Sequence, residues 1–259
     1  MCITQIENQE IFCSVVMPVH NGERFLCEAI DSVLKQTYKN FEFLIIENCS
    51  TDSSVEIIKS YNDPRIRLII EEDCGQVQAY NKGFKETKGS YVFIHGQDDI
   101  SHSERFEKQL KYSVIQNIDI CGSNISLIDE KGNSKGNFIF SSTNEKIKEE
   151  LIYKIVLHNS ATCIKRAIFC QIGYWNEKHF PIADIEFYLR AAYNNCEFYN
   201  IQEFLYVYRK HTKQITYLNR VKKSKVFQKI AINYCIERFD EKKILLRFKG
   251  LIYYYNYNM

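Results

Sequence analysis

Residues 91–101 read YVFIHGQDDIS and join a short apolar run to an acidic turn. The run 91–94 has the unbroken apolar character of a buried strand in a parallel sheet. The turn that follows carries two adjacent carboxylates, Asp98 and Asp99. In open α/β sheets, ligands bind in the crevice beyond the carboxyl ends of the strands. Mg²⁺ and Mn²⁺ prefer oxygen ligands and are often completed by substrate phosphates, so this stretch predicts a metal site for a phosphate-bearing ligand.

A structural interpretation of the same turn is also open. The side chain of Asp99, Ser101 or Ser103 could cap the helix that is expected at 104–116. Such a cap accepts hydrogen bonds from N–H groups that have no partner within the first helical turn.

The residues before this turn alternate between apolar strands and amphipathic helices. We expect strands at 12–19, 41–46 and 65–70, and helices at 22–37, 50–61 and 72–88. This order predicts a mostly parallel α/β sheet with right-handed crossovers and helices on both faces. Neither a G-x-G-x-x-G fingerprint nor a G-x-x-x-x-G-K-[ST] loop occurs. Phosphates therefore need another partner, and a cation on Asp98 and Asp99 would be one.

The second half of the chain loses this rhythm. We expect a hairpin at 125–139, helices at 144–156 and 183–194, and a strand at 204–209. Residues 220–249 then contain ten Lys or Arg against three Asp or Glu, and tyrosines follow as far as residue 257. A basic, aromatic helical tail can contact an anionic membrane surface, or it can pack on the domain as a solvated helical hairpin.

Composition limits the class of protein. A chain of 259 residues suits one large domain, or one domain with a C-terminal extension. The formal net charge of +2 gives no indication of a nucleic acid partner. The first residues lack the pattern of a signal peptide, and no apolar run approaches the length of about 18 residues that spans a bilayer. We therefore expect a soluble cytoplasmic protein, peripheral at most to the inner face of the membrane.

Ten cysteines are scattered along the chain without any C-x-x-C pair. A structural zinc site normally shows close ligand pairs, and several of these cysteines lie in apolar runs. Reduced thiols are therefore expected, as in most cytosolic proteins.

Two long segments resemble the family 2 glycosyltransferases, which have the GT-A fold. They are residues 14–52, SVVMPVHNGERFLCEAIDSVLKQTYKNFEFLIIENCSTD, and residues 75–99, GQVQAYNKGFKETKGSYVFIHGQDD. Shorter matches follow at Gly173-Tyr174, at DIEFYLR (184–190) and at YRKH (208–211). The resemblance implies a GT-A domain at 1–219, with a donor-binding half at about 12–123 and an acceptor half at about 124–219. Residues 220–259 would then form an extension.

This sequence departs from the family pattern at two places. The turn after the second strand reads Glu47-Asn48-Cys49, where the family more often has Asp-Asp-Gly. In the acidic turn, Gly96 replaces an upstream acidic residue that is often present. Asp98 and Asp99 are retained, so the resemblance still implies binding of Mn²⁺ or Mg²⁺.

The resemblance also assigns roles to individual residues. Asp99 is the first choice as metal ligand, with Asp98 and His211 as further candidates, and Asp98 could also reach the ribose or the sugar. Asp184 matches the position of the catalytic base, with Glu186 in reserve, although both could simply favour a helix N-terminus. The residues expected to contact the nucleotide are Pro18, Val19, Asn21, Glu47, Asn48, Gln76 and Asn81. On the acceptor side, Trp175 could stack on a sugar ring or pack in the core.

These features together predict an inverting, metal-dependent glycosyltransferase. It would move a sugar from a nucleotide sugar, with UDP as the expected nucleotide, to a hydroxyl of a surface-glycan or lipid-linked acceptor. One alternative is a catalytically silent protein that binds nucleotide sugars or acts as a scaffold, with Gly96 and Cys49 as signs of lost activity. Another is a nucleotidyltransferase, which would usually carry a Gly-rich basic loop after the first strand, where this chain has HNGERF.

Overall fold

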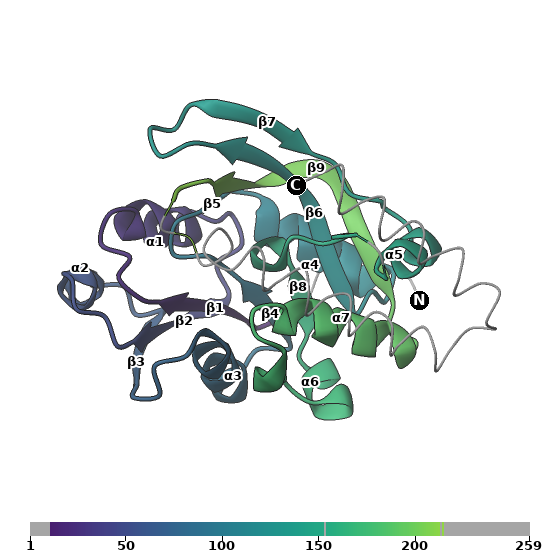
Figure 1. The fold of residues 1–259 in the computed structure, drawn as a ribbon, viewed down its shortest axis with the longest axis horizontal. Helices are drawn as coiled ribbons and strands as arrows, with labels where there is room; N and C mark the ends of the chain where they lie inside the picture. Colours follow the sequence, from purple (N-terminus) through teal and green to yellow (C-terminus); the bar gives the residue numbers. More distant parts are fainter. Residues whose placement is uncertain (1–10, 153, 213, 215–259) are drawn as a thin grey trace.

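A nine-stranded sheet organises the part of the chain that the structure, a computed structural model, describes: residues 11–152, 154–212 and 214 (Figure 1). Its strand order is β3-β2-β1-β4-β8-β6-β9-β5, and β7 pairs with β6 outside this path. The strands are β1 (Cys13–Val19), β2 (Phe41–Asn48), β3 (Ile66–Glu71), β4 (Tyr91–Ile94), β5 (Ile100–Ser101), β6 (Ile120–Ile128), β7 (Ser134–Phe138), β8 (Cys163–Lys165) and β9 (Phe198–Arg209).

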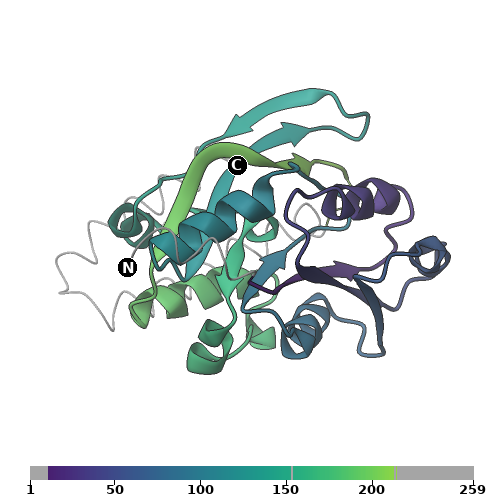
Figure 2. The same cartoon turned by 180° about the vertical axis from the view of Figure 1, so that it is seen from behind.

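Helices cover both faces of this sheet, as the sequence predicts (Figures 1 and 2). They are α1 (Leu26–Leu34), α2 (Ser54–Ser60), α3 (Gln76–Glu86), α4 (Arg105–Ile115), α5 (Asn144–Glu150), α6 (Ala167–Ile172) and α7 (Ala183–Tyr193). Apolar side chains of α1, α2 and α4 pack on one face, and those of α3, α5, α6 and α7 pack on the other. The unbroken apolar runs of β1, β2 and β4 follow from this arrangement, because strands covered on both sides bury every side chain.

The N-terminal half is the predicted parallel unit. β1 pairs in parallel with β2 and β4, and β2 pairs in parallel with β3. Consequently the turns after these four strands meet at one edge of the sheet, where a ligand crevice is expected.

The C-terminal half is mixed. β8 runs antiparallel to both β4 and β6, whereas β6 runs parallel to β9. The two-residue strand β5 follows the acidic turn directly and pairs antiparallel with the end of β9, with Ile100 opposite Val207. This non-local pairing brings the acidic turn next to the residues that follow β9.

Some element boundaries differ from those predicted. Helix α5 ends at Glu150 instead of continuing to residue 156, and β9 begins at Phe198, six residues before the expected strand. The helical tail predicted at 220–259 lies outside the described residues. Among the residues that are described, no helix is long and apolar enough to cross a membrane.

The prediction that all cysteines are free thiols is wrong for one pair. Cys49 and Cys74 form a disulfide, with their Cα atoms 5.6 Å apart. They lie 25 residues apart in the sequence, so no short spacing motif announces them. They meet because β2 and β3 are parallel neighbours and end at the same edge of the sheet. Six other described cysteines are free: Cys13, Cys27, Cys121, Cys163, Cys170 and Cys196.

Candidate active site

Hydrogen bonds tie together the turns that follow β1, β2 and β4. The amide of Gln97 bridges the backbone of His20: its Oε1 accepts from the His20 N–H at 2.7 Å, and its Nε2 donates to the His20 carbonyl at 3.0 Å. The Nδ1 of His20 lies 2.6 Å from the carbonyl of Asn48. Gln97 was not predicted as a site residue, because only the folded chain brings the first and fourth turns together. It holds the acidic turn in a fixed position relative to the first two strands.

Asn21 strengthens the same connection. Its Oδ1 accepts a hydrogen bond from the Thr51 N–H at 2.8 Å, and its own N–H donates to Ser50 Oγ at 3.1 Å. Asn21 has a φ of 50°, a left-handed conformation that asparagine tolerates better than most residues. Asn21, which was predicted to contact the nucleotide, therefore also shapes the turn after β1.

The predicted nucleotide-binding residues at the ends of β1 and β2 lie side by side. Val19 and Glu47 are register partners, and both are buried; Pro18 is half-buried. The Glu47 carboxylate accepts a hydrogen bond from the Ser50 N–H. Asn48 is also buried, and within the described residues its Oδ1 has no hydrogen-bond partner.

The two carboxylates of the acidic turn have different surroundings. Asp99 is only 2% exposed; its Oδ2 accepts from the Tyr206 hydroxyl at 2.9 Å and its Oδ1 from the Arg209 N–H at 2.9 Å. Burial, followed by the nearby charge of Asp98, raises the pKa of Asp99 well above its usual value. Asp99 thus points into the protein and joins the turn to β9. Its role as the first-choice metal ligand stays a prediction, and its burial favours Asp98 for that role.

Asp98 is the carboxylate that remains available. Its side chain is 18% exposed, and its Oδ2 lies 2.7 Å from Nε2 of His211. The amide of Gln214 donates to the same oxygen at 3.4 Å. The structure therefore brings together two of the three predicted metal ligands, Asp98 and His211, from positions 113 residues apart.

The donor set fits a divalent cation that is completed by substrate. No group of three or more His, Cys, Asp or Glu side chains suited to a metal occurs within the described residues. One carboxylate and one imidazole would leave most positions to phosphate oxygens and water, which is how Mg²⁺ is usually held at phosphate sites. At Gly96, a Cβ would lie 2.5 Å from Asp99 Oδ2. A larger residue at this position requires the Asp99 carboxylate to shift.

A buried arginine supports the acidic turn from below. The fully buried Arg105 donates to the carbonyls of Ile94 and Thr162, at 2.9 and 3.1 Å, and to Ser101 Oγ at 3.0 Å. Its guanidinium lies 4.8 Å from the ring centre of Tyr206, the residue that bonds Asp99. Arg105 thus links the ends of β4 and β8 beneath the site.

His95, at the start of the turn, is buried beside Arg105. Burial and the charge of Arg105 lower the pKa of His95 from 6.5 to about 3. The neutral imidazole therefore contributes stability that is complete above pH 6.5 and is lost as the pH falls toward 3, because only the unfolded chain takes up a proton in that interval.

We expect the His95→Leu variant to be less sensitive to acid than the wild type. Below pH 6, the free energy of unfolding of the wild type should fall with each pH unit by about 1.4 kcal/mol more than that of the variant. Urea titrations from pH 7 to pH 4.5 measure this, and parallel pH profiles for the two proteins would contradict it.

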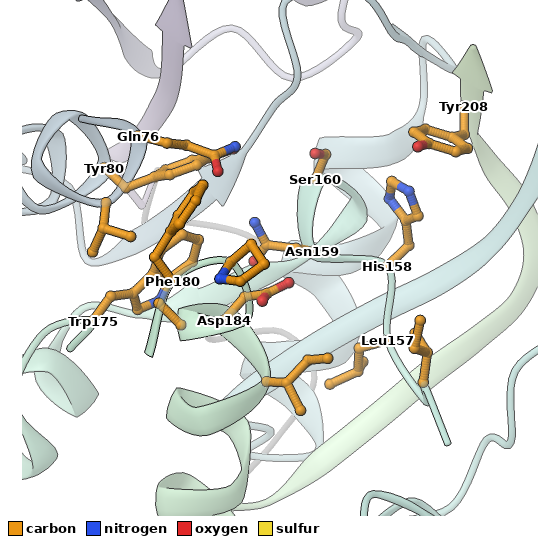
Figure 3. Close-up of a pocket in the computed structure, with 15 residues that line it drawn as sticks. Gln76, Tyr80, Leu157, His158, Asn159, Ser160, Trp175, Phe180, Asp184 and Tyr208 are labelled. Atoms are coloured by element: carbon orange, nitrogen blue, oxygen red, sulfur yellow. The ribbon is translucent and has the colours of Figure 1, made fainter. Parts of the chain in front are cut away.

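A cavity of about 230 Å³ lies between the two halves of the molecule. Asp184, the second residue of α7, lines it and points inward (Figure 3). Ile182 occupies the N-cap position of α7, and no side-chain capping bond is formed there, so the structure does not support the capping interpretation of Asp184. The other labelled residues around it are Gln76, Tyr80, Leu157, His158, Asn159, Ser160, Trp175, Phe180 and Tyr208 (Figure 3).

Tyr80 connects this cavity with the acidic turn. Burial raises the pKa of Tyr80, and the negative charges of Asp184, Asp99 and Asp98 raise it further. All three carboxylates are therefore close enough to act on one buried phenol. Asp184 and the acidic turn therefore act on the same buried phenol, although Asp184 and Asp99 are 85 residues apart in the sequence.

Trp175 lines the cavity, and Asn81 binds its backbone. The Trp175 ring packs 4.4 Å from that of Tyr80, centre to centre, and is buried. The amide of Asn81 accepts from the Trp175 N–H at 3.0 Å and donates to its carbonyl at 2.9 Å. Asn81, predicted to contact the nucleotide, holds Trp175 in place. Gln76, on the same helix, lines the cavity as a ligand contact would.

Glu186 is not among the residues that line the cavity. It is 5% exposed, and both its oxygens pair with Arg190, at 2.9 and 3.0 Å. Arg190 also donates to the carbonyl of Tyr174 at 2.8 Å, so this pair fixes the Gly173-Tyr174 turn. Asp184 is therefore preferred over Glu186 as the base.

Glycosyltransferases with the GT-A fold have a parallel sheet with an acidic turn at its carboxyl edge. They also have a carboxylate in the neighbouring cavity, as Asp184 is here. Residues 14–171 match the family described as glycosyl transferase family 2. This chain belongs to that family and is a glycosyltransferase. It is 34% identical over 222 residues to a glycosyltransferase of Methanocaldococcus jannaschii, covering 83% of this chain and 76% of that one. It is 30% identical over 223 residues to glycosyltransferase GlyG of Streptococcus pneumoniae, covering 78% of this chain and 72% of that one.

Solved structures confirm the predicted GT-A fold. S. aureus TarS (residues 1–349) superposes with a TM-score of 0.73 at 16% identity, over 96% of this chain and 73% of that one. The same protein in complex with UDP superposes with a TM-score of 0.67 at 18% identity, over 90% of this chain and 68% of TarS. The mannosyltransferase PcManGT from Pyrobaculum calidifontis, in complex with GDP-Man and Mn²⁺, gives a TM-score of 0.67 at 13% identity, over 90% and 66% of the two chains.

Proposed function

We propose that this protein is a metal-dependent, inverting glycosyltransferase that uses a nucleotide sugar, with UDP as its nucleotide. The observation that carries this proposal is the pairing of Asp98 with His211, 2.7 Å apart at the carboxyl edge of the sheet, while Asp184 lines the cavity. Family membership makes a silent scaffold or a nucleotidyltransferase the weaker interpretation, and the retained acidic residues argue against loss of activity.

Each of these side chains has a distinct task in the proposed reaction. Asp184, inside the cavity, accepts the proton of the acceptor hydroxyl as that oxygen attacks the anomeric carbon. Attack from the side of the base, with departure of the diphosphate on the opposite side, inverts the anomeric configuration. Asp98 and His211 would hold the cation, which when bound neutralises negative charge on the leaving diphosphate. Gln97 and Asp99 keep the turn of Asp98 in place.

Two structural relatives support a nucleotide-sugar donor. TarS has been solved with UDP and with UDP-GlcNAc, and PcManGT with GDP-Man and Mn²⁺. Because these proteins are less than 20% identical to this chain, their ligands suggest which donors to test first and do not identify the donor.

We also propose an acceptor for the enzyme and its location in the cell. A surface-glycan or lipid-linked acceptor would enter over the acceptor half, residues 124–219, and the donor would bind to residues 12–123. The basic extension at 220–259 would hold the enzyme at the cytoplasmic face of an anionic membrane. This part of the proposal rests on the amino-acid composition of the extension, with a net charge of +7 over 220–249.

Donor hydrolysis across a panel of UDP, GDP and dTDP sugars, with Mn²⁺, Mg²⁺ or EDTA, tests the proposed activity. We expect turnover with one nucleotide class, and loss of turnover in EDTA that added metal restores. Nucleotide binding by calorimetry without any turnover would instead support the silent protein. Turnover that is unchanged in EDTA would contradict the metal requirement.

A further inference from the structure

The disulfide between Cys49 and Cys74 lies at the edge of the proposed donor site. Cys49 directly follows Glu47 and Asn48, the predicted nucleotide contacts at the end of β2. Cys74 lies two residues before Gln76, which opens α3 and lines the cavity. The bond thus joins the nucleoside end of the site to the helix that carries Tyr80.

This connection completes a set of linked turns. Hydrogen bonds of Gln97, His20 and Asn21 already join the turns after β4, β1 and β2. The register between strands β2 and β3 ends with Asn48 opposite Glu71. The disulfide joins them immediately after this point and attaches the turn after β3 to the other three.

The turn after β3 has few other attachments to hold it. Its hydrogen bonds are local: the Gly75 N–H donates to the Asp73 carbonyl at 2.7 Å, and the Asp73 N–H to a Glu71 carboxylate oxygen at 3.4 Å. Glu72, Asp73 and Cys74 are exposed. Without the covalent bond, local hydrogen bonds of this kind leave an exposed turn free to sample several conformations.

The backbone conformation of Cys49 also indicates that the Cys49–Cys74 disulfide has a function. Cys49 has a φ of 58°, the left-handed region that glycine adopts without strain, and other family members often have glycine there. A cysteine at this position carries a conformational cost that glycine avoids, and its thiol is what allows a link to Cys74.

We propose that the Cys49–Cys74 disulfide holds the turn after β3 and the first turn of α3 in their donor-binding position, so that the oxidised enzyme binds its nucleotide donor more tightly than the reduced enzyme. The inference rests on the proposed function. In the oxidising step, the two thiols transfer two electrons and two protons to a small-molecule disulfide, which leaves as two thiols; a dithiol reverses the reaction. In a reducing compartment, the pair makes donor affinity respond to the thiol–disulfide balance.

Calorimetric titration with UDP, GDP and dTDP, each with Mg²⁺, tests this in oxidised and reduced protein. Oxidation uses 2-hydroxyethyl disulfide, a neutral reagent suited to a cysteine flanked by Glu71, Glu72 and Asp73, and reduction uses dithiothreitol.

If the reduced turn occupies its binding conformation for about a tenth of the time, reduction weakens nucleotide affinity about tenfold. We expect this loss in the wild type. Cys74→Ser should show the reduced affinity under both conditions, whereas Cys170→Ser, which removes an exposed free thiol elsewhere, should respond as the wild type does.

Peptide mapping keeps the possible failures apart. Trypsin releases Cys49 in peptide 40–59 and Cys74 in peptide 68–82, each with a single cysteine, so the linked pair has a unique mass. Equal affinities of the two forms, with the linkage mapped in the oxidised form, would overturn this inference and leave the proposed function standing. Thiols that stay free after oxidation would also overturn it. If no form bound any of the nucleotides, the proposed function would fail and this inference with it.

Discussion

Asp184→Asn is expected to lower kcat by about 10³-fold and to change the KM for the donor little. The asparagine has nearly the same shape and keeps the cavity wall, but its amide cannot accept a proton from the attacking hydroxyl. Because the N-cap residue of α7 is Ile182 and not Asp184, the helix should remain folded, and thermal unfolding should change little. Steady-state transfer kinetics and a melting curve measure both effects.

Glu186→Gln is the matched control, since it makes the same chemical change two residues further along the same helix. It weakens the pair with Arg190, so we expect a lower melting temperature with kcat within a few-fold of the wild type. A large fall in kcat for Glu186→Gln, with wild-type turnover for Asp184→Asn, would reverse the two roles.

Asp98→Asn is expected to lower kcat/KM by about 10²-fold or more and to raise the Mn²⁺ concentration that gives half-maximal activity. An amide oxygen is a weaker, neutral ligand for a hard cation, and the predicted second ligand beside it is His211. His211→Gln should shift the Mn²⁺ requirement in the same direction. Activity measured over a range of Mn²⁺ concentrations, with the donor concentration varied at each, checks both variants.

Asp99→Asn separates metal binding from support of the turn. This residue is buried against Tyr206 and the backbone of Arg209, so its replacement should reduce stability and leave the half-maximal Mn²⁺ concentration near that of the wild type. If Asp99→Asn shifted the Mn²⁺ requirement more than Asp98→Asn, the assignment of the cation to Asp98 would be wrong.

The donor-binding half could be predicted well from sequence because its signals are local. Apolar runs such as 41–46 identify buried strands, and the helical stripe around Ile30 identifies a helix that covers them. The order of these elements fixes a parallel sheet and places Glu47 and Asp98 at the same edge. The same reasoning served less well for the shortest strands, β5 with two residues and β8 with three. Strands that short carry almost no periodic pattern.

The sequence by itself determined the βα order, the family and most of the polar residues from which the site is built. Only the tertiary structure decided which of them face a ligand. The pairing of β5 with β9 turns Asp99 inward and sets Asp98 beside His211, and parallel β2 and β3 bring Cys49 to Cys74. Side-chain direction and burial depend on contacts between residues far apart in the chain, whereas a sequence pattern reports only neighbours within a strand or a helical turn.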